Sequence, residues 1–212
     1  DSIVHLAATH SFAPVVNLES AKWHPMQGFA DAATWTEAFG EDLRGIPLTL
    51  TWAPHPKPLP RAVPNQVLLT AAQMGMDVRI ANPEGFDLDP ALIRRSTQLA
   101  EQNGGGVRCF ADAARAAKGA RVVVAKSWSG TAVYNDPVRE AASRIQYADW
   151  MVSQSLLNHT HNAGFMHCLP VRRNVVVSDA VLDGEHSWVQ TEANFRLWTA
   201  MAALERVLTE SV

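Results

Sequence analysis

The stretch Arg121-Val122-Val123-Val124-Ala125-Lys126-Ser127-Trp128 decides the fold class of this protein. Its consecutive valines form a short β-branched run, which is typical of a β-strand. The run ends in lysine, serine and tryptophan, whose side chains can contact a ligand. The stretch therefore predicts a strand with ligand-competent residues at its carboxyl end.

Similar short runs lie on both sides of this stretch, at Leu48–Trp52, Val78–Ala81, Val107–Phe110 and Gly164–His167. Helical patterns separate them, near Pro64–Met74, Asp89–Gln102, Ala111–Lys118 and Pro137–Ser143. Alternating strands and helices are the signature of βαβ units. We therefore predict an α/β fold with a doubly wound, mostly parallel sheet flanked by helices. A last helix, roughly Glu192–Thr209, carries an apolar stripe that we expect to be core: Leu197, Met201, Leu204 and Leu208.

The composition excludes several classes of protein. Of 212 residues, 47% are hydrophobic and 18% charged, which argues against disorder. The net charge of -3 offers no basic field for nucleic acid, and no apolar run reaches the length of a membrane span. Two cysteines in separate strand-like contexts predict free thiols in a reducing cytoplasm. The chain opens on Asp1 in a helix-like segment, so we expect the true N-terminus to be missing.

Polar residues follow three of the predicted strands. His55 lies shortly after the first, Lys126 follows the fourth, Arg121–Ala125, and Cys168 and Arg172 follow the fifth. Ligands of open parallel sheets collect beyond the carboxyl ends of strands, so we expect these side chains to line one crevice. The run Gly164–Asn174 combines a His-Cys pair, a proline and two arginines, and it predicts a site for an anionic, carbonyl-bearing ligand. The alternative is a buried cysteine before a loop with two solvated arginines.

Three motifs carry a resemblance to a known family: Phe165–Asn174, His24-Pro25-Met26-Gln27 with the following Phe29-Ala30-Asp31, and Thr51–Leu59. With them the chain resembles the second domain of an N-acylornithine carbamoyltransferase, a branch of the aspartate/ornithine carbamoyltransferase superfamily. The resemblance runs from end to end but covers only the later two-thirds of such an enzyme. The Ser-Thr-Arg-Thr-like phosphate loop of the first domain has no counterpart here, so we expect this chain alone to be inactive.

The resemblance also implies a division of the chain. Residues 1–40 would be the end of the carbamoyl-phosphate domain with a linking helix, and residues 41–190 the acylornithine-binding α/β domain. Residues 191–212 would be a C-terminal helix that returns toward the missing domain. The full enzyme would be a cytoplasmic homotrimer of arginine biosynthesis, without a cofactor or metal.

The implied reaction is attack of the δ-amine of N-succinyl- or N-acetyl-L-ornithine on carbamoyl phosphate. Catalytic roles fall on His24, Gln27, Cys168 and Arg172, with the His24 imidazole donating to the developing oxyanion. Cys168 and Leu169 would bind ligand through their main-chain carbonyls, with Leu169-Pro170 as the cis peptide candidate.

The substrate-binding positions follow from the same resemblance. Arg172 would meet the α-carboxylate of the acylornithine, and its neighbour Arg173 would be structural. Glu19, His55 and Lys126 would also contact the acylornithine, while Arg196 would reach carbamoyl phosphate. Val176 stands where acetyl-preferring relatives have a lysine, which favours N-succinylornithine.

Other functions remain open on the residues alone. One is a carbamoyltransferase for free ornithine, and another is a non-catalytic amino-acid-binding module. A cysteine hydrolase using Cys168 and His167 is disfavoured, because adjacent strand residues point to opposite faces. A metal site from His159, His161 and His167 lacks a carboxylate or cysteine at ligand spacing, so we predict none.

Overall fold

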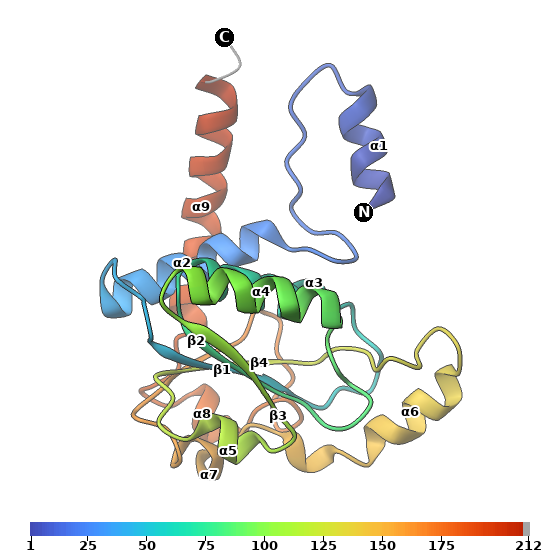
Figure 1. The fold of residues 1–212 in the computed structure, drawn as a ribbon, viewed down its shortest axis with the longest axis vertical. Coiled ribbons are helices and arrows are strands. Elements are labelled where there is room, and N and C mark those ends of the chain that lie inside the picture. Colours follow the sequence, from blue (N-terminus) through green and yellow to red (C-terminus); the bar gives the residue numbers. More distant parts are fainter. Residues whose placement is uncertain (210–212) are drawn as a thin grey trace.

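The computed structural model describes residues 1–209 and contains a five-stranded parallel sheet (Figure 1). The strands lie in the order β3-β2-β1-β4-β5. Their bounds are β1 Pro47–Trp52, β2 Asp77–Ala81, β3 Gly106–Phe110, β4 Val122–Lys126 and β5 Gly164–Met166. The fold class is thereby confirmed as α/β with a parallel sheet.

The strand order creates a switch point between β1 and β4. The chain passes from β1 outward to β2 and β3, and then returns to the other side of β1 for β4 and β5. Trp52 and Lys126, the last residues of β1 and β4, are partners in the ladder. The loops that leave these two strands diverge to opposite sides, which opens a crevice at their carboxyl ends.

Helices cover both faces of the sheet. In Figure 1, α2, α3 and α4 lie above it, while α5, α7 and α8 lie below. Their bounds are α2 Pro25–Phe39, α3 Ala62–Gln73, α4 Pro90–Gln102, α5 Ala113–Ala117, α7 Gln154–Leu157 and α8 Asp179–Leu182. The remaining helices are α1 Ser2–His10, α6 Pro137–Ile145, the 3₁₀ turn Ala148–Trp150 and α9 Val189–Thr209. None of the described helices has the length and hydrophobicity of a membrane span.

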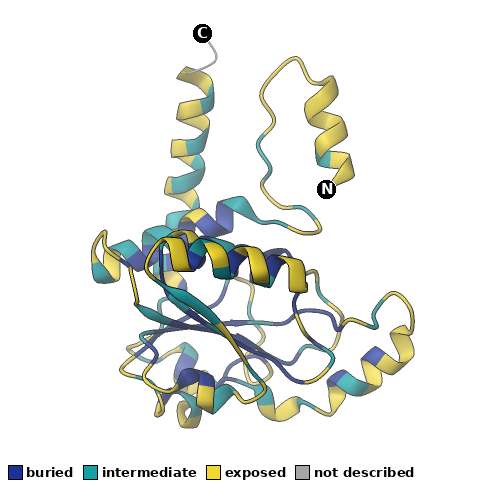
Figure 2. Ribbon diagram, in the orientation of Figure 1, coloured by how far each residue is buried: buried dark blue, intermediate teal, exposed yellow. Residues whose placement is uncertain are grey.

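The apolar core follows from the burial of the central strands (Figure 2). All residues of β5 are buried, as are most of β1 and β4, whereas the edge strand β3 is largely accessible. Tryptophans fill the layer between the sheet and α2 and α3, and their buried indole N–H groups have partners. Trp52 Nε1 donates to the main-chain oxygen of Trp128 at 3.0 Å, and Trp35 Nε1 contacts Met166 Sδ at 3.1 Å.

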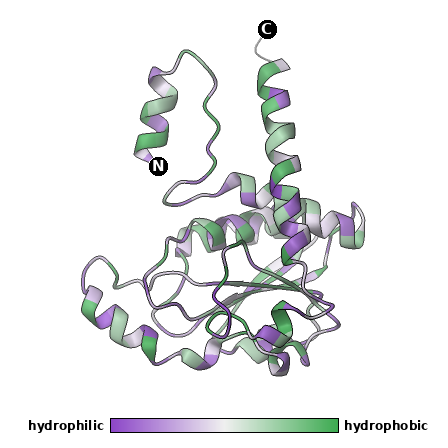
Figure 3. Cartoon of the chain, turned by 180° about the vertical axis from the view of Figure 1, so that it is seen from behind, coloured by the Kyte–Doolittle hydropathy of each residue, from purple (hydrophilic) through white to green (hydrophobic). Residues whose placement is uncertain are grey.

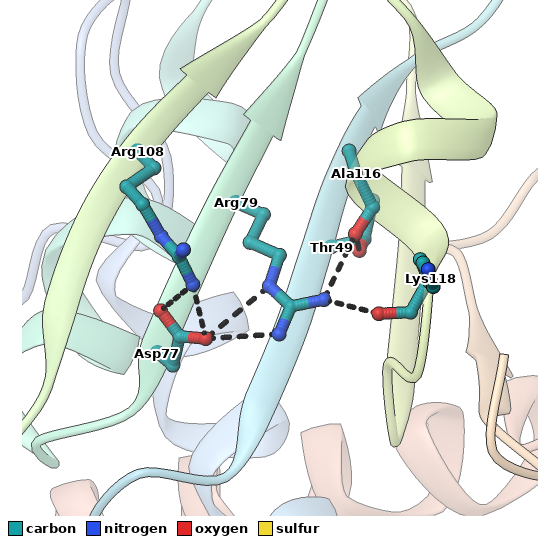
Figure 4. A network of polar contacts seen from close by, with 6 residues as sticks. All are labelled: Thr49, Asp77, Arg79, Arg108, Ala116 and Lys118. Carbon is teal, nitrogen blue, oxygen red and sulfur yellow. Dashed lines mark hydrogen bonds and ion pairs between the residues drawn. The ribbon is translucent and has the colours of Figure 1, made fainter.

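A polar network fixes α5 to the sheet at the amino end of β2 (Figure 4). The Asp77 carboxylate accepts hydrogen bonds from Arg79 on the same strand and from Arg108 on the neighbouring strand β3. Arg79 also donates to the main-chain oxygens of Ala116 and Lys118, which are at the end of α5. Free carbonyls at a helix end need donors, so the arginine satisfies them. The network lies at the amino edge of the sheet, whereas the polar residues at the strand ends lie at the opposite, carboxyl edge.

The predicted elements are confirmed, with differences at their ends. Asp89 caps α4 as expected, because its carboxylate accepts from the Ala91 amide at 2.8 Å. His167, predicted as part of the last strand, lies just after it. The short helices α7 and α8 were not predicted. Their four-residue lengths are too short for an amphipathic pattern to show.

The prediction that the α9 stripe is core is wrong within this chain. Leu197, Met201, Leu204 and Leu208 are all more than half exposed, because α9 leaves the sheet after its first turns (Figures 2 and 3). Figure 3 shows hydrophobic residues along this exposed part of the helix. Residues 210–212 of the predicted segment 191–212 lie outside the described residues.

Gly164 at the start of β5 has no room for a side chain. A Cβ there would lie 2.1 Å from the Trp188 ring. We expect Gly164→Ala to lower the free energy of unfolding by about 1–3 kcal/mol, the usual cost of overpacking. Gly106→Ala is the matched control, since Gly106 also begins a strand and a Cβ there would meet no atom within 4 Å. Urea denaturation of both variants measures the difference, and equal losses would contradict the steric explanation.

Candidate functional site

A cavity of about 320 Å³ lies at the carboxyl edge of the sheet, between the ends of β4 and β5 and the first turns of α2 and α9. Seven of the nine predicted site residues line it: Glu19, His24, Gln27, Lys126, Cys168, Leu169 and Arg196. These residues are spread over most of the chain, so only the parallel sheet and its flanking helices bring them together. A cavity at a topological switch point is the expected place for a ligand.

The other two predicted residues, His55 and Arg172, contact each other beside this cavity. Arg172 Nε donates to His55 Nε2 at 3.0 Å, which requires the His55 proton on Nδ1. Nδ1 then donates to the main-chain oxygen of Lys57 at 2.9 Å. Burial lowers the pKa of His55, and the positive charges of Arg172 and Lys126 lower it further. A neutral His55 thus holds the exposed Arg172 guanidinium in place without neutralising its charge.

His24 is held at the start of α2. It is the N-cap residue, with Pro25 in the first turn, and its main-chain oxygen accepts from the amides of Gln27 and Gly28. Burial lowers the pKa of the imidazole, although the charge of Glu19, 3.9 Å away, opposes the effect. His24 Nδ1 is buried, and the main chain of Leu18 interacts with the ring. Nε2, the nitrogen nearer Glu19, can donate a hydrogen bond to a ligand in the cavity when it carries the proton of the neutral ring.

Lys126 and Cys168 form a direct contact on the cavity wall. Lys126 Nζ donates to Cys168 Sγ at 3.1 Å. Burial nonetheless raises the pKa of the Cys168 thiol, so the thiol stays protonated. A protonated thiol is a poor nucleophile, which argues against covalent chemistry at this residue.

The expectation that His167 and Cys168 point to opposite faces assumed a strand through both residues, and that assumption is wrong. The strand ends before them, and both residues line the cavity. Among the described residues, the imidazole and the thiol make no side-chain hydrogen bond with each other, and the His167 ring interacts with the main chain of Cys168. Burial and the charge of Lys126 lower the pKa of His167 to about 3, and its Nδ1 is buried without a partner. The pair therefore lacks the thiolate–imidazolium contact that a cysteine hydrolase needs.

We expect Cys168→Ser to keep measurable activity in the full-length enzyme. The thiol carries no negative charge in this environment, and serine preserves the main chain that contacts the cavity. Steady-state turnover tests this, with circular dichroism to show that the variant is folded. Complete loss of turnover in a folded variant would assign the thiol a chemical role.

The turn after Cys168 has the predicted geometry. The Leu169-Pro170 peptide bond is cis, which confirms the prediction. Arg173 behaves as a structural residue: it pairs with Asp179 at 2.9 Å and Asp183 at 2.7 Å, and these carboxylates raise the pKa of its guanidinium. Of the twin arginines, only Arg172 thus lacks a carboxylate partner within residues 1–209.

Sequence reasoning missed two buried acids beside the site. Gln27 Nε2 donates to Asp31 Oδ1 at 2.8 Å and to Glu192 Oε1 at 2.5 Å. Asp31 appears in one of the quoted motifs, and Glu192 begins the predicted last helix, but neither position alone reveals a partner. The contact between Gln27 and Glu192 spans 165 residues. The feature that marks these two acids is their burial, and burial is seen only in the tertiary structure.

Arg196 lies one turn after Glu192 on α9 and lines the same cavity. Its Nη1 atom is buried and has no hydrogen-bond partner in the described chain. With Lys126 it supplies positive charge for an anionic ligand. Among residues 1–209, no group of three or more His, Cys, Asp or Glu side chains is arranged to hold a metal ion.

The chain matches a known family over most of its length. A profile described as "Aspartate/ornithine carbamoyltransferase, Asp/Orn binding domain" matches residues 61–207. The N-acetylornithine carbamoyltransferase of Xanthomonas campestris is 37% identical over 213 residues, which is all of this chain and 62% of the relative. The N-succinylornithine carbamoyltransferase of Bacteroides fragilis is 36% identical over 206 residues, covering 97% of this chain and 59% of the relative.

A solved structure agrees with these relatives. A crystal structure of acetylornithine transcarbamylase complexed with acetylcitrulline has a TM-score of 0.93 and 37% identity, and it covers 97% of this chain and 62% of that one. The chain thus spans less than two thirds of the length of these relatives. The match to the profile, the parallel sheet and the cavity at its switch point lead to one conclusion: the chain belongs to the aspartate/ornithine carbamoyltransferase family, within its Asp/Orn binding domain.

Proposed function

We propose that this chain carries the amino-acid half of a carbamoyltransferase active site. The complete enzyme transfers the carbamoyl group of carbamoyl phosphate to the δ-amine of an N-acylated ornithine and releases phosphate. The observation that supports this most is the shared cavity, which collects Lys126, Cys168 and Arg196 with the His-Pro-x-Gln segment. Acyl-transfer chemistry of this kind needs positioning and charge stabilisation more than a covalent intermediate, and these residues supply both.

In this proposal the residues act in three ways. The neutral His24 donates to the carbamoyl oxygen as it becomes an oxyanion, and Arg196 neutralises the phosphate. The main-chain carbonyls of Cys168 and Leu169 accept from the attacking amine and the carbamoyl amide. The δ-nitrogen bonds to the carbamoyl carbon to form the tetrahedral intermediate. The C–O bond to phosphate then breaks as the carbonyl is restored, and the departing phosphate takes the proton that the amine loses. No cofactor takes part.

Arg172 binds the α-carboxylate of the acylornithine, and His55, Lys126 and Glu19 complete that part of the site. The free guanidinium edge of Arg172 matches a carboxylate, since a planar fork forms two parallel hydrogen bonds. An acylated α-nitrogen is neutral, whereas a free α-amine is positively charged. The site contains several cations, and among the described residues no carboxylate pairs with Arg172. The neutral, acylated nitrogen therefore fits this site better than a free α-amine.

We further propose N-succinylornithine as the preferred substrate. Val176 is buried in the apolar cluster beneath the sheet, where acetyl-preferring relatives have a lysine, so this position offers no ammonium group to the site. Identities of 37% to an N-acetylornithine enzyme and 36% to an N-succinylornithine enzyme do not separate the two substrates.

The proposal extends to the rest of the enzyme. Residues 1–40 and 191–212 belong with a carbamoyl-phosphate domain, and residues 41–190 form the acylornithine domain. This assignment agrees with the packing of α2 against α9, which brings residues 25–39 and the first turns of α9 together. We propose a cytoplasmic homotrimer of arginine biosynthesis as the working form.

A substrate panel tests the proposed function. The full-length enzyme is assayed for citrulline-type products with carbamoyl phosphate and N-succinyl-, N-acetyl- or free ornithine. We expect the highest kcat/KM with N-succinylornithine and a far lower value with free ornithine. Preference for free ornithine would overturn the acyl assignment, and inactivity with all three would favour a non-catalytic binding module.

A further inference from the structure

We propose that Asp31 and Glu192 share one proton and are positioning residues that fix Gln27 with its amide oxygen toward the cavity. This inference deepens the proposed function, since it concerns the same site and names what Gln27 offers to a ligand. It is based on which hydrogen bonds the buried side chains of Gln27, Asp31 and Glu192 make and which of their polar atoms have no partner among the described residues.

The Gln27 amide nitrogen has two N–H donors, and both are used. One goes to Asp31 Oδ1 at 2.8 Å and the other to Glu192 Oε1 at 2.5 Å. All three side chains are at most 3% exposed, so water does not compete for these hydrogen bonds. The amide orientation is thereby fixed, because an oxygen in place of Nε2 would face two carboxyl oxygens.

The remaining two carboxyl oxygens are the second observation. Asp31 Oδ2 and Glu192 Oε2 are both buried and have no hydrogen-bond partner in the described chain. Gln27 gives each carboxyl group one donor, and the main chain of His167 also acts on Glu192. Two neighbouring carboxylates that are both ionised would still repel each other strongly in this buried environment. A single proton between the carboxyl groups removes one charge and gives each remaining oxygen a partner.

The surroundings agree with a shared proton. Burial raises the pKa of Asp31 to about 7, and burial with the negative charge of Asp31 raises the pKa of Glu192 well above its usual value. The cations that face the pair are Arg196 on α9 and Lys126 at the end of β4, and within residues 1–209 they act on it by charge at a distance. The titratable side chains of His24, His167 and Cys168 line the same cavity, and burial disfavours the charged form of each.

As a consequence, Gln27 offers the ligand a hydrogen-bond acceptor and no donor. Gln27 lines the cavity, and only its oxygen is left to interact with a ligand. This end of the cavity therefore accepts a hydrogen bond from a ligand N–H group. In the proposed reaction that donor is the carbamoyl amide, so the acid pair helps the site distinguish a carbamoyl group from a carboxyl or phosphoryl group of similar size.

Infrared spectroscopy of the full-length enzyme tests the proton directly. We expect a carbonyl band from a protonated carboxylic acid near neutral pH, which disappears as the pH rises through about 7 and beyond. Asp31→Asn should remove that titration. Glu140→Gln is the control, because Glu140 is equally buried but paired with Arg144, and it should leave the band in place. A band that is missing in the native enzyme, or that persists in Asp31→Asn, would overturn the shared proton.

Kinetics test the positioning role. When both acids ionise, their repulsion releases Gln27, so we expect the KM for carbamoyl phosphate to rise on the alkaline side. Asp31→Ala should raise this KM at least about tenfold at neutral pH, since it frees one amide hydrogen. Asp31→Asn should raise it much less and abolish the alkaline rise, because its amide nitrogen donates permanently to Glu192. Equal effects of the two substitutions, or an alkaline rise that survives Asp31→Asn, would contradict positioning.

These measurements separate the inference from the proposed function. The infrared band reports on the acid pair even in an enzyme that transfers no carbamoyl group. An active enzyme without the band would retain the proposed function and lose only the inference. An inactive enzyme with the titrating band would lose the function and keep the proton-sharing pair.

Discussion

His24→Ala should lower kcat of the full-length enzyme by about a hundredfold to a thousandfold, or ~2.7–4 kcal/mol, the usual cost of one oxyanion donor. The reason is geometric, because His24 caps α2 at the cavity and offers a neutral N–H donor there. The donor works mainly in the transition state, so KM should change little.

The pH dependence of the native enzyme adds a second criterion. Burial lowers the pKa of His24, so the imidazole stays neutral to lower pH than an exposed histidine. Activity that depends on the neutral ring is therefore kept until the pH falls below the ordinary histidine range. His161→Ala is the matched control, since His161 is exposed and away from the cavity wall. Normal turnover of His24→Ala would refute the oxyanion role.

Arg172→Ala has the second large expected effect, on substrate affinity. It should raise the KM for the acylornithine roughly tenfold to 150-fold, because a charged hydrogen bond to the α-carboxylate is lost. This increase corresponds to about 1.5–3 kcal/mol of binding free energy. The turnover number should change less, since this carboxylate is remote from the reacting carbonyl. Initial rates over a range of acylornithine concentrations measure both constants.

Arg173→Ala is the natural control for that experiment. Arg173 is the neighbouring residue, yet its guanidinium is occupied by Asp179 and Asp183. Its loss should leave KM unchanged and change the stability little, because these ion pairs are exposed to solvent. If both substitutions changed KM equally, Arg172 would have no special place in the site.

Much of the fold could be predicted because its signals are local. The valine run of β4 and the similar runs of the other strands are short, apolar and β-branched, and helical patterns separate them. Alternation of this kind has one common solution, a parallel sheet with helices on both faces. Part of the cavity wall could be predicted for the same reason, since polar residues such as Lys126 stand at strand ends that a parallel sheet brings to one edge.

Other features depend on contacts between distant segments. The sequence determined which residues stand at strand ends, but it could not show that Arg172 would rest on His55 or that α9 would expose its apolar stripe. Only the tertiary structure brought Asp31 and Glu192 to the same amide group. The physical reason is that burial and charge pairing arise from neighbours in space, whereas hydrophobic periodicity is already present in the order of the residues.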